Sequence, residues 1–516
     1  MAAARKALIG GALFSFWVCA PAFAADPLSA IEWLEKRPKQ IVVPLPELEK
    51  FDEPPVAAFI TTPDVTVSPI GAPMRAAAGL LPSSVTGLSR QIWVQSEAES
   101  ITALLAALDV EQHPALLSLL YTLLLAEADP PSDARGASFM RARVQKLLDL
   151  GAIDPASALL ERADPAHIDL FDLYFDVALL SGDAERPCKA LSTEPSLSRD
   201  LARRIFCDVQ SQNWDNAALT LSTGDAIGAL GSIDVALLER FLDPELFEET
   251  QIPAPPSAPS VLQFRLFEAI GEALPTASLP RAFSAVDLSG DAGWKAQLEA
   301  AERLARVGAI SENRLLGIYT SRIPSASGGV WDRVEAIQRL ETALKSGDPI
   351  AILERAKHAW QQMGTAELQV PFATLFAEKL MGMPDTSDAD ADLITRIALL
   401  SPLYEQAAAR KAKDLALQAA QSLAIGEPVQ TGPHAFYPAI QTAFSSATPP
   451  EFLSDMAKEG RLGEAILRAM SLAAVGATGD PGALQSGLAF LRSVGLEDTA
   501  RRTALQLILR GESGQQ

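Results

Sequence analysis

From about residue 88 to the end of the chain, apolar residues recur every three or four positions. Ile101, Leu104, Leu105 and Leu108 show this spacing, which places them on one face of a helix. A second helix is expected over residues 112–128, because an Asp-Pro-Pro sequence follows it and proline stops a helix. Two helices joined by a short turn form a hairpin. The pattern therefore predicts an all-α protein built from antiparallel helix hairpins.

Helix starts and stops can be located from individual residues. Ser96 followed by Glu99 fits a capping box, in which each side chain accepts a free backbone amide at a helix start. Gly151 suits the left-handed position that ends a helix, Asp154 could cap the next helix, and Pro155 suits the first position of that helix, where no amide hydrogen is needed. These residues predict one hairpin joint near residue 151.

Similar joints recur along the chain. Gly308 is followed by Ser311 as the expected cap, and weaker versions surround Gly182, Gly460 and Gly495. The joints at 151 and 182 are 31 residues apart and those at 460 and 495 are 35 apart, which are spacings of a two-helix repeat.

In these joints, over residues 134–222 and 458–510, the sequence resembles tetratricopeptide and Sel1-like repeat proteins. The resemblance implies an α-solenoid-like stack of helix pairs and a protein or peptide partner. The chain is also similar to exported helical proteins of Gram-negative bacteria, a likeness that implies no particular activity.

Proline divides the remainder of the chain. A short helix is expected over residues 27–37, and nine prolines from Pro38 to Pro82 then exclude a helix. Residues 25–87 are therefore expected to form a short helix followed by a proline-rich extended arm. Its apolar content favours partial burial in a groove of the helical body over a solvated tether. A second proline-rich segment, 251–260, separates helical regions 88–250 and 261–516, which form either two cores or one curved array.

The first residues match a secretory signal. Arg5 and Lys6 precede a nearly apolar run over residues 7–20, and Ala22 and Ala24 give the small-x-small pattern read by a signal peptidase before Ala25. The alternative, a membrane anchor, needs a run of roughly 20 residues. We expect cleavage between Ala24 and Ala25, loss of residues 1–24, and a periplasmic protein.

Cleavage would leave two cysteines, Cys188 and Cys207, because Cys19 lies in the leader. An oxidising compartment favours a bond between such a pair. We therefore expect a structural disulfide. A redox pair is the alternative, but its cysteines are usually closer together, as in CxxC.

The net charge of the chain limits the classes of partner that are expected. Loss of Arg5 and Lys6 would move the formal net charge from −21 to −23. Phosphate backbones and anionic lipids are bound by clustered Lys and Arg, so neither nucleic acid nor a membrane surface is expected as a partner. The longest later apolar stretch, 116–126, is too short to span a bilayer and is expected to be a core helix.

We find no catalytic or metal-binding motif. The four histidines, at positions 113, 167, 358 and 434, lack the spacing of a zinc helix. Asp388, Asp390 and Asp392 imitate a calcium loop, but Leu393 and Leu399 replace its required Gly and Glu, so these acids more simply begin a helix.

Other enzyme signatures are also missing. The sequence has no GxSxG elbow and no phosphate-binding loop. The Glu-Ser pair of a lytic transglycosylase has its nearest counterpart in Glu99 and Ser100, inside the expected capping box, and no second motif follows. Trp294 and Trp214 are expected to pack in the core of their hairpins. No cofactor and no metal are expected.

These patterns favour a non-catalytic scaffold or interaction module of the envelope, with a protein or peptide partner of basic character. Two alternatives stay open: a cell-wall-remodelling enzyme or its accessory subunit, and a small-ligand binder. The sequence leaves the oligomeric state and the partner's identity open.

Overall fold

Helices form most of this protein, as the apolar spacing predicts, and the fold is all-α. The computed structural model describes residues 77–245, 251–289, 291–384, 387–427, 436–445 and 447–511, and these residues include no β-strand. The expected signal sequence with its cleavage site at Ala24 and Ala25, most of the proline-rich arm, and His434 lie outside the described residues. No helix in these ranges is both long and apolar enough to cross a bilayer.

The helices of the first half have the bounds α2 Ser83–Thr86, α3 Ala98–Ala107, α4 Pro114–Leu125, α5 Ser138–Asp149, α6 Ile153–Arg162, α7 Phe171–Ser181, α8 Glu185–Thr193, α9 Leu201–Gln210, α10 Trp214–Ala226 and α11 Ser232–Leu242, with a short 3-10 turn η3 Pro195–Leu197. The second half begins with α12 Val261–Ala269, η4 Thr276–Ser278, η5 Arg281–Ser289, α13 Trp294–Ala305, α14 Glu312–Thr320, α15 Val330–Ser346, α16 Pro349–Gly364 and α17 Gln369–Met381. It ends with α18 Asp388–Leu399, α19 Tyr404–Ala407, α20 Leu415–Ala424, α21 Tyr437–Ser445, α22 Glu451–Lys458, α23 Leu462–Ala477, α24 Pro481–Ser493 and α25 Glu497–Gly511.

The predicted glycine joints lie between helices. Gly151, Gly182, Gly308, Gly460 and Gly495 all have positive φ, between 67° and 85°, a region that glycine enters without a Cβ penalty. The helices on either side of these joints pack against each other, as in α5 with α6, α13 with α14 and α24 with α25. The joints predicted from sequence are therefore confirmed.

Helix caps were predicted less well. Ser311 caps α14 by accepting the amide of Arg314, as expected. Ser96 and Glu99 do not form a capping box, because α3 begins at Ala98 and the distant carboxylate of Asp133 accepts that amide at 2.9 Å. Asp154 also caps nothing.

Asp154 lies in the first turn of α6, two residues after the cap position at Ala152. Its side chain instead pairs with Arg314 of α14 at 3.2 Å. In both places a residue distant in sequence, Asp133 or Arg314, makes a contact that local spacing does not show.

Helix α4 is the core helix expected from the apolar run at 116–126. Leu116, Leu120 and Leu124 are at most 1% exposed. The C-terminal end of α4 is held by Arg143 of α5, whose guanidinium donates to the carbonyls of Leu124 and Ala126 and, through Nη1, to Ala78, each at 2.8 Å. Burial lowers the pKa of Arg143 to about 10. This residue fixes the start of the described chain to the helical body.

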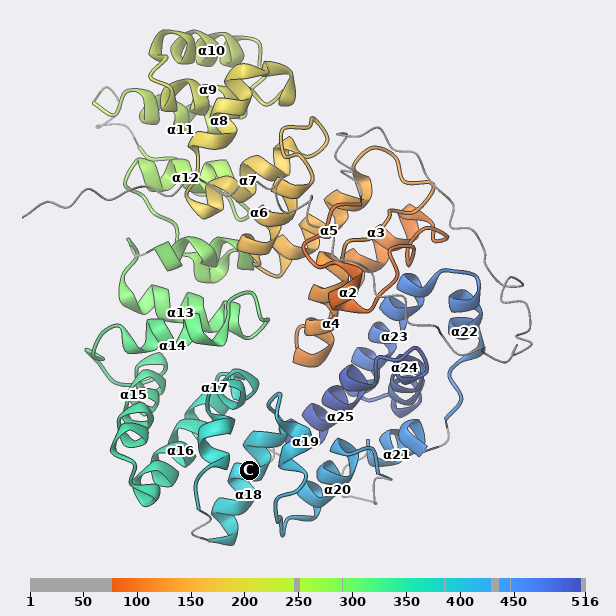
Figure 1. Ribbon diagram of the computed structural model, residues 1–516. Coiled ribbons are helices and arrows are strands. Elements are labelled where there is room, and N and C mark those ends of the chain that lie inside the picture. Colours follow the sequence, from red (N-terminus) through yellow and green to blue (C-terminus); the bar gives the residue numbers. More distant parts are fainter. Residues whose placement is uncertain are drawn as a thin grey trace, which may run out of the picture. The chain divides into compact units, whose positions relative to one another are not determined.

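The last helices of the chain pack against the first ones. Helix α23 contacts α3, and α25 contacts α4, so segments more than 350 residues apart lie side by side in Figure 1. Gln506 of α25 accepts the amide of Ala115 at 3.1 Å, and Arg510 donates to the carbonyl of Gln112 at 2.9 Å. The described helices belong to one compact unit with one continuous apolar cluster.

Candidate functional site

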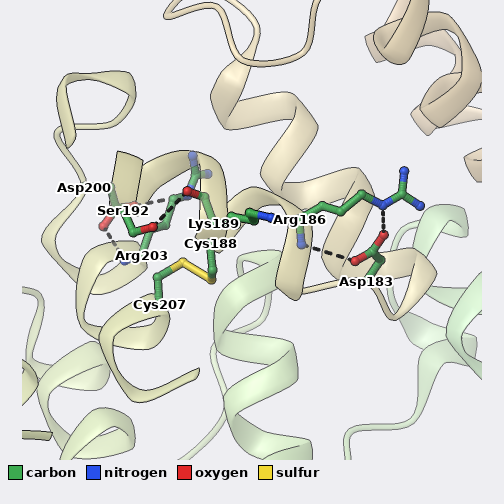
Figure 2. Close-up of a disulfide and its surroundings, with 8 residues drawn as sticks. All are labelled: Asp183, Arg186, Cys188, Lys189, Ser192, Asp200, Arg203 and Cys207. Carbon is green, nitrogen blue, oxygen red and sulfur yellow. Dashed lines mark hydrogen bonds and ion pairs between the residues drawn. A yellow bond between two sulfur atoms is a disulfide. The ribbon is translucent and has the colours of Figure 1, made fainter. Parts of the chain in front are cut away.

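The two cysteines expected to pair form a disulfide between α8 and α9. Cys188 and Cys207 have Cα atoms 4.9 Å apart and a bonded S–S distance of 2.00 Å. Both are buried, at 2% and 5% exposure. Figure 2 shows the bond crossing between the two helices, with ion pairs of Arg186 and Arg203 nearby. The bond therefore joins two packed helices and is shielded from solvent.

Helix α9 is fixed to its neighbours at its start. The carboxylate of Asp200 caps it by accepting the amides of Ala202 and Arg203. The guanidinium of Arg203 lies over the ring of Phe175 in α7, 5.1 Å from its centroid, and pairs with Asp172 and Asp176. These contacts join α9 to α7.

One of the acids beside Arg203, Asp176, differs from an ordinary surface carboxylate. Burial raises the pKa of Asp176 to about 6, although Arg203 acts in the opposite direction. Its neighbours Asp172 and Asp200 add to the rise because like charges disfavour ionisation. Three carboxylates of this part of the chain therefore share the guanidinium of Arg203.

Helix α10 packs on α9 and carries the most exposed apolar side chains of this region. Ala217 and Leu221 face α9 and are buried. Trp214 at the first position is 49% exposed, Leu219 is 65% exposed and Ile227, which follows the last residue, is 71% exposed. Trp214 was expected in the core, and this prediction is wrong. Its position at the edge of the α8–α11 region leaves its ring without a covering helix.

We name these three residues, together with Asp215 and Asp225 of the same helix, the α10 surface. Asp208 of α9 holds the start of α10 by accepting the side-chain amides of Asn213 and Asn216, at 3.4 and 2.6 Å. Other exposed large apolar residues of the described chain are spread over separate elements, and none of those elements exposes three of them. The segment 214–227 is the one described segment of this size whose helix and cap together expose three large apolar side chains.

Two buried carboxylates were not found from the sequence. Glu302 of α13 is 2% exposed and accepts Arg333 at 2.7 and 2.6 Å and the hydroxyl of Tyr319 at 2.7 Å. Burial, with Glu302 adding to it, raises the pKa of Tyr319 well above its ordinary value. Glu302 and Tyr319 are buried, the side chain of Arg333 is 14% exposed, and together they join α13, α14 and α15.

The second buried carboxylate, Glu464 of α23, has a fully buried side chain and lies between Arg461 and Arg468, at 3.0 and 2.8 Å. It also accepts the hydroxyl of Ser100 in α3 at 3.2 Å. The spacing of Arg461, Glu464 and Arg468 puts them on one helix face, a signal that could have been read from sequence. No such local signal connects Glu302 with Arg333.

The remaining candidates from the sequence are placed as follows. His113 precedes α4, at the N-cap position, and His167 lies 3.7 Å from Asp169. Asp388 and Asp390 are in the first turn of α18, as the helix-start interpretation predicts, and Ser387 caps that helix. Trp294 is buried against Trp331, as expected. Within the described ranges no group of three His, Cys, Asp or Glu residues could hold a metal ion.

No family model, curated protein or solved structure matches this chain.

Proposed function

We propose that this protein is a non-catalytic interaction module of the bacterial cell envelope, and that the α10 surface binds a polypeptide with basic and apolar side chains. The observation that carries the proposal is the exposure of Trp214 and Leu219 in α10 and of Ile227, which follows its last residue. Tryptophan contributes strongly to protein interfaces because it buries a large apolar area and still offers an N–H donor.

Charge indicates the chemistry of the partner. From residue 205 to residue 239 the chain contains five acidic residues and no Lys or Arg. This stretch covers α10 and the segments on both sides of it. An acidic rim around apolar side chains attracts a basic partner and disfavours an acidic one. We therefore expect the partner to place Lys or Arg beside Asp215 and Asp225.

The structure of this region suits a binding surface. The disulfide and the Arg203 contacts hold α9, and α9 in turn supports α10. A rigid support lowers the entropy that is lost when a partner binds. The envelope location is supported by the disulfide, which persists in an oxidising compartment, and by the signal-like first residues. Kinship with tetratricopeptide-like repeats is part of this proposal and is supported by the glycine joints.

Site-specific crosslinking tests the proposal. A photoreactive amino acid replaces Leu219 in one variant and Ile350 in a control, since both side chains are exposed, at 65% and 72%. In living cells we expect the 219 variant to form a defined adduct with a basic protein, and the control to form none. The yield of this covalent adduct should fall when the crosslinking is carried out at high salt, because screening reduces the attraction between exposed charges that forms the complex.

Three results would contradict the proposal. The first is equal labelling from both positions. The second is crosslinking of position 219 to the chain itself or to a second copy of it. The third is an adduct with an acidic protein that salt does not affect.

A further inference from the structure

Three carboxylates share one guanidinium where α9 meets α7. The side chain of Arg203 in α9 is 14% exposed and lies over the ring of Phe175 in α7. Its Nη1 donates to Asp172, its Nη2 donates to Asp176 at 3.2 Å, and its Nε lies 3.5 Å from Asp200. The contacts that Arg203 makes between the two helices therefore depend on the charge of these carboxylates.

Two of the three carboxylates are supported by other donors. Ser198 donates its hydroxyl to Asp172 at 3.0 Å, and Asp172 lies in the first turn of α7, where the helix dipole favours a negative charge. Asp200 caps α9 and accepts the backbone amides of Ala202 and Arg203, at 2.9 and 3.4 Å. Hydrogen bonds to the charged form of a carboxylate favour that form.

Asp176 lacks this support. It lies in the middle of α7, and among the described residues only Arg203 donates to it. Its side chain is 28% exposed, and burial raises its pKa to about 6. Asp176 is therefore the carboxylate of this junction whose charge changes between pH 7 and pH 5.

The charged groups that act on the pKa of Asp176 all belong to this junction. They are Arg203, Asp172 and Asp200, and no charged group of α5, α6, α8, α12 or η5, which also pack against α7, adds to them. Arginines on the helices around α7 donate to groups other than Asp176; these are Arg141 of α5, Arg186 of α8, Arg204 of α9 and Arg265 of α12.

Apolar and covalent contacts hold α9 in place whatever the pH. Phe206 of α9 packs edge-on against Phe175, with ring centroids 6.2 Å apart, and stacks on Phe241 of α11. The disulfide joins α9 to α8, and Figure 2 shows Asp200 and Arg203 close to it. A change of charge at Asp176 therefore changes the strength of the junction and leaves its architecture intact.

We propose that the α7–α9 junction is a pH-dependent clamp, in which protonation of Asp176 holds α9, with α10 packed on it, more firmly against α7 in mild acid than at neutral pH. A neutral Asp176 no longer carries a partly buried charge and no longer repels Asp172 and Asp200, which still hold Arg203. The clamp goes beyond the proposed function, because it requires no partner.

The direction of the effect follows from linkage. A carboxyl whose pKa is higher in the folded state than in the open state stabilises the folded state as the pH falls. This stabilisation is lost again as the pH rises through about 6, the pKa of Asp176 in the folded protein.

Hydrogen exchange of the purified full chain tests the proposal, because exchange reports the local opening of a helix. Protection of the α9 amides is measured at pH 7 and at pH 5 and corrected for the intrinsic exchange rate at each pH. With a pKa of about 6 in the closed junction and the ordinary value of 3.8 in the open one, protection should be about tenfold higher at pH 5. In Asp176→Asn, whose side chain is neutral at both pH values, protection of α9 should be equal.

The matched control is Asp154→Asn, because Asp154 also pairs with an arginine, Arg314, but its side chain is 78% exposed. This variant should keep the tenfold rise in α9. Helix α24 is the reference within the wild type and should show no such rise. The proposal is overturned if α9 protection in the wild type does not rise between pH 7 and pH 5, if α24 rises as much, or if Asp176→Asn keeps the rise. Comparison of α9 with α24 in the wild type decides the matter even if Asp176→Asn does not fold.

Discussion

Glu464 is the most completely buried carboxylate among the described residues, and its arginine partners determine its effect on stability. Removing this carboxylate leaves Arg461 and Arg468 without it, and because their side chains are 32% and 39% exposed the cost is about 1–3 kcal/mol. We expect Glu464→Gln to lower the free energy of unfolding by about this amount in urea titration. The control is Glu459→Gln, since Glu459 also pairs with Arg461 but its side chain is 62% exposed. Equal loss in both variants would contradict this account.

The same residue predicts a pH dependence. Burial alone would raise the pKa of Glu464, but hydrogen bonds from Arg468 and Arg461 outweigh it and hold the pKa below its ordinary value of 4.5. A carboxyl whose pKa is lower in the folded state stabilises the fold above the unfolded value and loses this effect as the pH falls. From about pH 5 downward, the Tm of the wild type should therefore fall faster than that of Glu464→Gln. Parallel curves would rule this out.

The role of a single residue was predictable from the sequence where that role depends only on residues nearby in the chain. Ser311 caps its helix because its partner amide is three residues away. Trp214 could not be placed, because helical spacing shows which side of a helix is apolar and not whether another helix covers it. The α10 surface was therefore missed, although the acidic run around it is visible in the sequence.

At the level of helices, Gly463 and Gly317 show two opposite effects of glycine on stability. One glycine is needed for close packing, and the other only lowers the helix propensity of its segment. A Cβ on Gly463 of α23 would lie 2.5 Å from ring carbons of Trp93, which is 2% exposed. Gly463→Ala should therefore lower stability by about 1–3 kcal/mol. A Cβ on Gly317 of α14 would meet no heavy atom within 4 Å, so Gly317→Ala should stabilise by about 0.5–1 kcal/mol. Urea midpoints compare the two, and the same sign for both would contradict this packing.

The disulfide gives a second prediction for helices. Cys188 and Cys207 are 19 residues apart, and loop-closure entropy gives roughly 3 kcal/mol for a loop of about this size. We expect the double variant Cys188→Ala/Cys207→Ala to lose about this free energy of unfolding, and dithiothreitol to destabilise the wild type but not the variant. If the variant keeps the wild-type urea midpoint, the bond does not hold α8 and α9 together.

The order of the hairpins was predictable because glycine and proline act on their own neighbours. Contacts between distant helices were not. Glu111 and Arg281 form two hydrogen bonds, at 2.8 and 2.6 Å, between the α3–α4 turn and η5, although 170 residues separate them. No spacing rule connects such residues, so only the structure shows which hairpins meet.

At the level of the whole unit, packing of α23 and α25 against α3 and α4 gives the two ends of the described chain a shared core. Substitutions at this contact, such as those of Glu464 and Gly463, therefore change how strongly the last helices are held against the first ones. The α10 surface lies on helices outside this contact, so its variants should affect binding without affecting stability. This separation makes a direct test of function possible.

That test is the affinity between the purified protein and the basic partner captured at position 219. We compare the wild type with Trp214→Ser/Leu219→Ser and with the control Ile350→Ser/Leu415→Ser, whose native side chains are 72% and 74% exposed. The account predicts at least tenfold weaker binding for the α10 variant, about 1.4 kcal/mol, with an unchanged Tm and no loss in the control. Equal affinity of all three proteins would contradict it.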